Sequence, residues 1–121
     1  MARILAVDDS ASMRQMVGLT LKSAGHEVVS AADGDEALKL AREGSPVDLV
    51  ITDVNMPNMD GITLVKAIKE LPAYKFTPIV MLTTDASSER KSEGRAAGAT
   101  GWIVKPFNPE RLLETVNKVL R

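Results

Sequence analysis

A carboxylate closes one of the most apolar runs in this sequence. In the stretch DLVITDVNMPNMDG, residues 48–61, a strand-like apolar run ends directly in Asp53. An aspartate held at the end of a rigid strand can act as a nucleophile and form an acyl phosphate. Asn55 and Pro57 then turn the chain, so that a backbone carbonyl can face a cation beside that carboxylate.

Other polar side chains hold the same position relative to their own apolar runs. Asp8 and Asp9 follow the first run, Thr83 follows the fourth and Lys105 follows the fifth. If the runs are parallel strands of one sheet, these side chains converge outside the carboxyl ends of the strands, where ligands bind in such sheets. This convergence is the strongest functional signal in the sequence.

Three carboxylates at one edge of a sheet predict a hard metal ion. Asp8, Asp9 and Asp53 would repel one another unless a cation lay among them. Oxygen ligands without histidine or cysteine favour magnesium over zinc, and magnesium commonly binds through one or two carboxylates together with phosphate. Lys105 supplies a charge for a phosphoryl oxygen, to which the Thr83 hydroxyl can donate a hydrogen bond.

The rest of the chain predicts strands and helices in alternation. The expected strands are mostly continuous apolar runs, as in strands covered on both faces, and they are Ile4–Val7, Glu27–Ala31, Asp48–Thr52, Ile79–Leu82 and Gly101–Val104. Helical spacing marks the segments between them, of which Ser87–Ala97 is the least apolar. Five repeats of strand and helix predict an α/β fold with a parallel sheet, helices on both faces and right-handed crossovers.

Several residues mark where the helices begin and end. Asp33 followed by Glu36 resembles a capping box, and Asn108 is expected to cap the last helix. Gly25 and Gly44 are placed to end the first two helices.

Composition narrows the possible functions. The 121 residues suit one compact domain, and the formal net charge of -1 gives no general attraction to nucleic acid or anionic membranes. The absence of cysteine excludes disulfides, thiol nucleophiles and cysteine zinc sites. No stretch has the length of a membrane span or the pattern of a signal peptide, so a cytoplasmic protein is expected. His26, the only histidine, is expected at the surface.

Four motifs together carry a family resemblance. The stretches AVDDS, ITDVNMP, MLTT and IVKPF match, in order and spacing, those of response-regulator receiver domains, and the chain is most similar to the single-domain chemotaxis type. The resemblance covers the whole chain and implies one receiver domain over residues 1–121 without an output domain. It also implies a flavodoxin-like, doubly wound sheet of five parallel strands in the order 2-1-3-4-5, with five helices on both faces.

The resemblance assigns roles to the acidic residues. Asp53 would accept phosphate from a CheA-like histidine kinase, and the domain would assist its own phosphorylation and dephosphorylation without being an enzyme. Asp9, Asp53 and the backbone carbonyl of Asn55 would bind magnesium, and Asp8 would help directly or through water.

The resemblance also covers the switch residues. Thr83 would hold a phosphoryl oxygen, and Lys105 would bridge to the phosphoryl group or to an aspartate, with a cis bond between Lys105 and Pro106. Trp102 stands where the family usually has tyrosine or phenylalanine, and we expect it to be partly exposed against the fourth helix, on the partner surface. Thr84 stands where alanine or glycine is commoner and would crowd a hydrolytic water.

The expected output is a protein–protein contact. By resemblance the partner is the flagellar motor switch protein or another protein that recognises the phosphorylated form, and the receiver is a monomer. A phosphorelay carrier and a phosphate sink are alternatives within the family. A magnesium-dependent phosphatase with an aspartyl nucleophile is the alternative outside it, but such enzymes commonly have Asp-x-Asp where this chain has Asn55 as the second residue.

Simpler explanations exist for each residue taken alone. Asp8 and Asp9 could cap the first helix, and Asp53 could belong to a turn. Thr83 could be an ordinary strand-end residue and Lys105 a solvated charge. Only the convergence of all of them on one edge favours the site.

Overall fold

The computed structural model describes residues 2–84 and 88–120 as a three-layer α/β structure. Its strands are β1 Arg3–Val7, β2 Glu27–Ala31, β3 Leu49–Asp53, β4 Ile79–Thr83 and β5 Gly101–Val104. Its helices are α1 Ala11–Ser23, α2 Gly34–Glu43, α3 Gly61–Lys69, α4 Ser88–Ala97, α5 Pro109–Val119 and the short 3-10 helix η1 Pro72–Tyr74. The strands are parallel in the order β2-β1-β3-β4-β5, which confirms the expected fold class.

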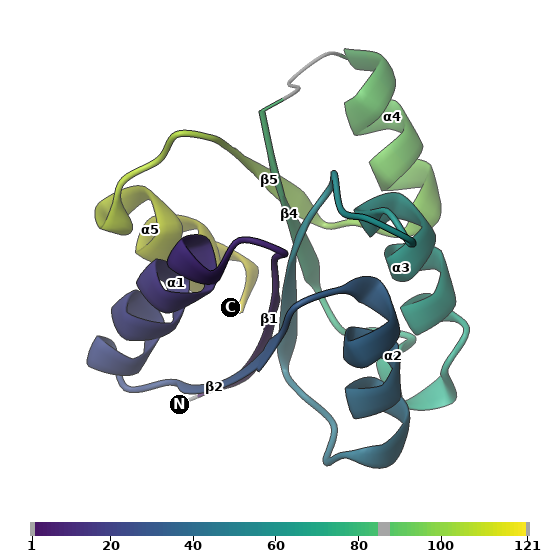
Figure 1. Cartoon of the computed structure of the whole chain (residues 1–121), viewed down its shortest axis with the longest axis horizontal. Helices are drawn as coiled ribbons and strands as arrows, with labels where there is room; N and C mark the ends of the chain where they lie inside the picture. The colour runs from purple at the N-terminus through teal and green to yellow at the C-terminus, as the bar shows by residue number, and fades with distance from the viewer. Residues whose placement is uncertain (1, 85–87, 121) are drawn as a thin grey trace.

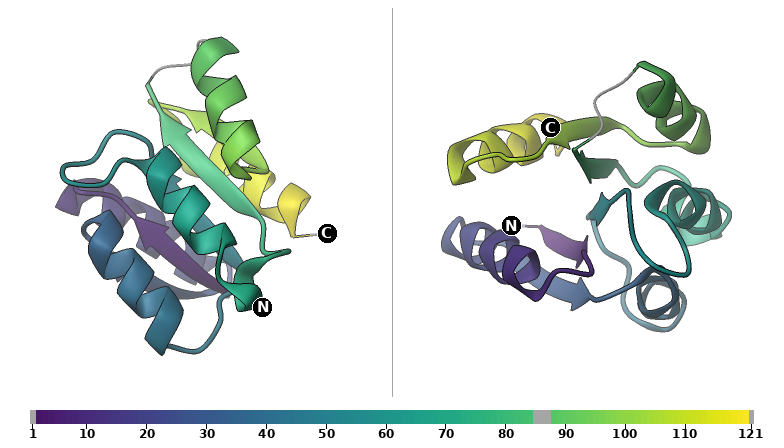
Figure 2. Two further views of the ribbon diagram at one scale, coloured as in Figure 1. Left: turned by 90° about the vertical axis from the view of Figure 1, so that its right-hand side faces the viewer. Right: turned by 45° about the horizontal axis from the view of Figure 1, so that its top comes forward.

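Two hydrophobic cores flank the sheet. Figures 1 and 2 show α1 and α5 on one face and α2, α3 and α4 on the other. Successive residues of a strand point to opposite faces, so Leu5 and Val50 enter the core under α2 and α3, whereas Ile4 and Ile51 enter the core under α1 and α5. Burial on both faces explains why the central strands have continuous rather than alternating apolar sequences.

Two strands run further toward the site than the sequence predicts. β3 starts at Leu49 rather than Asp48 and ends at Asp53, and β4 ends at Thr83. In the sheet register Asp53 pairs with Leu82 and Thr83 pairs with Val104. Both polar residues are therefore the last members of hydrogen-bonded strands, which fixes their backbones more firmly than a position in the following loop would.

Most expected helix boundaries are confirmed. Asp33 Oδ1 accepts a hydrogen bond from Glu36 N at 2.8 Å, although the Glu36 carboxylate reaches back to Ala32 N, one residue before the cap, at 2.7 Å. Asn108 caps α5. The helices α1 and α2 end just before the expected glycines, Gly25 and Gly44. The expected first residue of the fourth helix, Ser87, lies outside the described residues.

Two helix caps were not predicted, and both start helices beside the site. The Ser10 hydroxyl accepts from Met13 N at 3.3 Å to begin α1, and Asp60 Oδ1 accepts from Thr63 N at 2.8 Å to begin α3. Because Ser10 caps α1, the capping explanation for the two preceding aspartates is wrong. The carboxylates of Asp8 and Asp9 are therefore not used to cap this helix.

His26 is half-buried rather than fully at the surface. Its Nδ1 accepts a hydrogen bond from Ala2 N at 3.1 Å, which ties the start of β1 to the start of β2. Within residues 2–84 and 88–120, no helix is long and apolar enough to cross a bilayer.

Gly61 allows α3 to begin directly against the end of β3. Its backbone N–H donates to Val54 O at 2.7 Å. A Cβ atom at this position would overlap the Asp53 carbonyl oxygen and lie 2.9 Å from Val54 Cα. Backbone atoms cannot yield as a flexible side chain can, so only glycine fits here without moving the strand end.

Replacing Gly61 with alanine should therefore destabilise the fold by about 2 kcal/mol or more, since overpacking a close contact commonly costs about 1–3 kcal/mol. Gly18→Ala is the matched control, because a Cβ atom there meets nothing within 4 Å and alanine is better than glycine inside a helix by about 0.5–1 kcal/mol. Urea unfolding measures both free energies. Equal effects of the two substitutions would contradict the packing argument.

Candidate functional site

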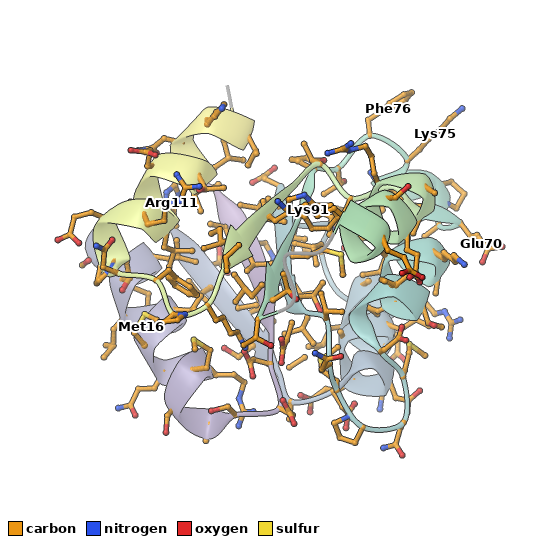
Figure 3. All side chains as sticks on the ribbon, turned by 90° about the horizontal axis from the view of Figure 1, so that it is seen from above. Met16, Glu70, Lys75, Phe76, Lys91 and Arg111 are labelled. Carbon is orange, nitrogen blue, oxygen red and sulfur yellow. The ribbon has the colours of Figure 1, made fainter. Side chains whose placement is uncertain are left out.

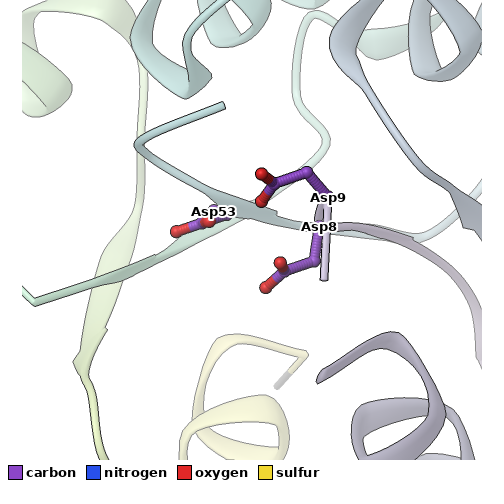
Figure 4. Close-up of side chains that lie close together, drawn as sticks. All are labelled: Asp8, Asp9 and Asp53. Carbon is purple, nitrogen blue, oxygen red and sulfur yellow. The ribbon is translucent and has the colours of Figure 1, made fainter. Parts of the chain in front are cut away.

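Three carboxylates from two strand ends lie together at the carboxyl edge of the sheet. Figure 4 shows Asp8 and Asp9, which follow β1, beside Asp53 at the end of β3. One oxygen of each carboxylate lies within 4.8 Å of the others. Asp8 and Asp53 are buried, whereas Asp9 is exposed. The structure thus brings together all the acidic residues that the sequence placed at this edge.

Asp8 is held from three directions. Its N–H donates to Ala31 O of β2 at 3.2 Å, and its Oδ1 accepts from Ser10 N at 2.9 Å. The Arg14 guanidinium donates to the Asp8 backbone carbonyl at 2.6 Å. Arg14 was missed in the sequence, where its only signal was a position in the second turn of the first helix. These contacts fix the carboxylate before any ligand arrives.

Lys105 joins the two buried aspartates. Its Nζ lies 3.1 Å from Asp53 Oδ1 and 3.3 Å from Asp8 Oδ2. Asp53 Oδ1 also accepts from Val54 N at 2.9 Å. Lys105 follows β5 immediately, with its N–H donating to Thr83 O at 2.8 Å, and the bond to Pro106 is cis, as the resemblance implied. A residue far along the chain therefore completes the site.

The switch residues occupy the neighbouring strands. Thr83 is buried at the end of β4, whereas Thr84 and Asn55 are exposed. Trp102 pairs with Met81 in the sheet register and is partly buried beside α4, where its ring lies so close to Gly94 that a side chain there would clash. The expected partial exposure of Trp102 against the fourth helix is confirmed.

Burial dominates the electrostatics of Asp53. Loss of solvent raises the pKa of its carboxyl above the usual value of 3.8, and the Asp8 charge raises it further. The hydrogen bond and charge of Lys105, together with Val54 N–H, act in the opposite direction but do not cancel these effects on the pKa. An additional cation would therefore be bound favourably at this edge.

The donor set fits magnesium. The residues in this cluster offer only oxygen ligands, one face of the cluster is open at Asp9, and the spacing allows one ion to reach each carboxylate. Hard cations prefer such ligands, and magnesium needs only one or two carboxylates when water or phosphate completes its coordination.

Comparison of the whole sequence with known protein families shows the family to which this site belongs. Residues 4–117 match the response regulator receiver domain. The chain belongs to the response-regulator receiver family. This match confirms the class that the motifs indicated, a response regulator that acts as a switch. The curated relatives described next do not favour a phosphatase, a phosphorelay carrier or a phosphate sink.

Relatives of this receiver span nearly its full length. It is 44% identical over 119 residues to the chemotaxis protein CheY of Bacillus subtilis, covering 98% of this chain and 97% of the relative. It is 40% identical to a CheY homolog of Campylobacter jejuni, covering 98% and 92%. Among solved structures, chemotaxis protein CheY4 of Vibrio cholerae superposes with a TM-score of 0.95 at 60% identity, with 98% of both chains covered.

The raised pKa of Asp53 predicts a pH-dependent stability effect in metal-free protein. Between pH 3.8 and the raised folded-state pKa, the folded state binds the proton more tightly than the unfolded state, so stability falls as pH rises through that window. Asp53→Asn removes this loss while keeping an oxygen for Val54 N–H. The variant should be more stable than the wild type at pH 7, with a gap that shrinks on acidification.

Thermal unfolding with a chelator measures the gap, and added magnesium should stabilise the wild type more than the variant. Asp35→Asn, at an exposed carboxylate in the first turn of α2, is the control and should show no such gain. A less stable Asp53→Asn protein at neutral pH without metal would show that the Lys105 contacts outweigh burial.

Proposed function

We propose that this receiver is a chemotaxis response regulator in the cytoplasm, phosphorylated on Asp53 by a CheA-like histidine kinase. The observation that carries the proposal is the Lys105 ammonium between two buried aspartates, beside a third carboxylate suited to a metal ion. The chemotaxis names of the relatives support the pathway. The output is a contact between the receiver itself and a partner such as the flagellar motor switch protein.

Asp53 is the nucleophile in this proposal. One of its oxygens attacks phosphorus while the bond from phosphorus to the histidine nitrogen breaks, and the imidazole keeps the electron pair of that bond. The contacts of Asp53 Oδ1 with Val54 N–H and Lys105 orient the carboxylate for this attack. Water then hydrolyses the acyl phosphate and ends the signal, and the exposed Thr84 beside the site slows this step by crowding that water.

The neighbouring groups stabilise the charge that phosphorylation adds. Asp9, Asp53 and the Asn55 carbonyl, with help from Asp8, would hold magnesium, which would supply positive charge to the carboxylates and the phosphoryl oxygens. The Lys105 ammonium moves its contact from the Asp53 carboxylate to a phosphoryl oxygen. The chain thus exchanges one charge pair for another instead of leaving an unpaired charge in a buried site.

Thr83 and Trp102 carry the signal outward. The Thr83 hydroxyl donates to a phosphoryl oxygen, which draws the end of β4 toward Asp53. Trp102 lies one strand further on, beside α4, so a shift of β4 changes the surface that this indole and the helix form together. The partner recognises that altered surface.

Phosphorylation by acetyl phosphate tests the site directly. The wild type should gain an acid-stable, base-labile phosphate only when magnesium is present, because the carboxylates need a cation to admit another anion. Asp53→Asn should gain none, whereas Asp35→Asn should behave as the wild type. Mass spectrometry of the labelled chain locates the group. A base-labile phosphate on another aspartate in Asp53→Asn would contradict the assignment.

Replacing Trp102 with alanine tests the proposed partner surface. If the indole is an interface anchor, binding of the phosphorylated receiver to the motor switch protein should weaken by about 2 kcal/mol or more. Phosphorylation should be unaffected, and Trp102→Phe should recover part of the affinity. Circular dichroism confirms that each variant is folded during titration. Reduced folding stability with unchanged partner affinity would make Trp102 a core residue only.

A further inference from the structure

A guanidinium from the first helix reaches the short segment that carries two of the three carboxylates. Arg14 is half-buried on α1, and its Nη1 donates to the backbone carbonyl of Asp8 at 2.6 Å. A backbone carbonyl belongs to the planar peptide group that joins its own residue to the next one. The hydrogen bond therefore holds the peptide group between Asp8 and Asp9, and not either carboxylate.

The position of Arg14 on the helix places it away from the core. Met16, labelled in Figure 3, packs against the core that α1 shares with α5. Successive residues of an α-helix are about 100° apart around its axis, so Arg14, two residues earlier, lies about 200° away, almost on the opposite side. Its own N–H donates to Ser10 O at 3.0 Å in the first turn. The guanidinium is thus carried by a helix that begins beside the acidic segment.

The direction of the Asp9 carboxylate depends on the backbone around it. This carboxylate is exposed, and it accepts no hydrogen bond from the described part of the chain. The peptide groups on both sides of Asp9 are held, however. Arg14 binds the carbonyl of the preceding one, and Asp8 Oδ1 accepts from Ser10 N of the following one at 2.9 Å. Rotation of either peptide group would swing the exposed carboxylate away from the two buried ones.

The charge of Arg14 does not explain its contact with the acidic segment. Burial raises the pKa of Asp53, and the charged residues that also shift this pKa are Lys105, which lowers it, and Asp8, which raises it. Arg14 is not among them. A positive charge near the carboxylates would moreover repel an incoming cation. Positioning by Arg14 and the charge of Arg14 therefore have opposite effects on metal affinity.

We propose that Arg14 is a positioning residue for the cation site, because it holds the peptide group between Asp8 and Asp9. The inference rests on the magnesium site of the proposed function. With the guanidinium in place, an oxygen of the exposed carboxylate stays within 4.8 Å of oxygens of the buried ones, so that one ion can reach all three. Without it, the carboxylates have to be brought into this arrangement as the ion binds, which weakens binding.

Calorimetric titration of the unphosphorylated full chain with magnesium tests this role. Arg14→Met removes the guanidinium but keeps an unbranched side chain that suits a helix. It should raise the Kd for magnesium about tenfold or more, as loss of groups that orient metal ligands commonly does. Lys22→Met is the matched control, because Lys22 is an exposed cation in the last turn of the same helix. It lies about 12 Å further along the axis, where salt screens its charge, so its Kd should stay within about twofold of the wild type.

Arg14→Lys is the rescue variant. A lysine ammonium can still donate to the Asp8 carbonyl, although without the planar fork of a guanidinium, so this variant should recover part of the lost affinity. Urea unfolding with a chelator shows that each variant is folded under the conditions of the titration. A raised Kd then belongs to the folded protein and does not reflect a loss of folding stability.

The sign of the change in Kd distinguishes positioning from charge. A lower or unchanged magnesium Kd in Arg14→Met would overturn the proposal, because loss of a positive charge alone strengthens cation binding. An equally raised Kd in Lys22→Met would overturn it too, since the effect would then not belong to the Asp8 carbonyl contact. Both results leave the magnesium site and the role of Asp53 intact. A wild type that binds no magnesium would instead overturn the metal site of the proposed function together with this role of Arg14.

Discussion

The structure depends on one electrostatic constraint: buried negative charges must lie close together without unfolding the edge that holds them. Asp8 and Asp53 are both buried, and the only ammonium between them in the described structure is that of Lys105. Burial raises the pKa of Asp53 despite the ion pair with Lys105, and the charge of Asp8 raises it further. Three carboxylates beside one ammonium leave net negative charge at this edge, which favours the binding of a cation there.

The parallel sheet makes such a site possible. Helices cover both faces of the sheet, so two hydrophobic cores hold the strands that end at Asp53 and Thr83. These strand ends therefore cannot move apart to reduce the repulsion between the carboxylates. The close start of α3 at Gly61 and the contact of Arg14 with Asp8 fix the adjoining loops. Packing of the apolar cores therefore offsets the unfavourable repulsion between the carboxylates at this edge.

The same architecture separates two kinds of surface. Strand direction gathers the acidic residues at the carboxyl ends, while the exposed Phe76 and a hollow that it lines lie at the amino ends. The first end holds the charged cluster of Asp8, Asp53 and Lys105. At the second end, the Lys69 ammonium donates to three backbone carbonyls of the segment that precedes β4.

The sequence alone determined the fold class, the aspartate cluster, Lys105 and most helix ends, because apolar periodicity and capping are local signals. It misplaced the ends of β3 and β4, since pairing with neighbouring strands decides whether a polar residue such as Asp53 or Thr83 stays in the sheet. It also missed the Arg14 contact with Asp8. Only the tertiary structure could decide how strongly Lys105 offsets the burial of Asp8 and Asp53. The pKa of Asp53 depends on its burial and on distances of a few ångströms between residues that are far apart in the sequence, and the sequence alone specifies neither.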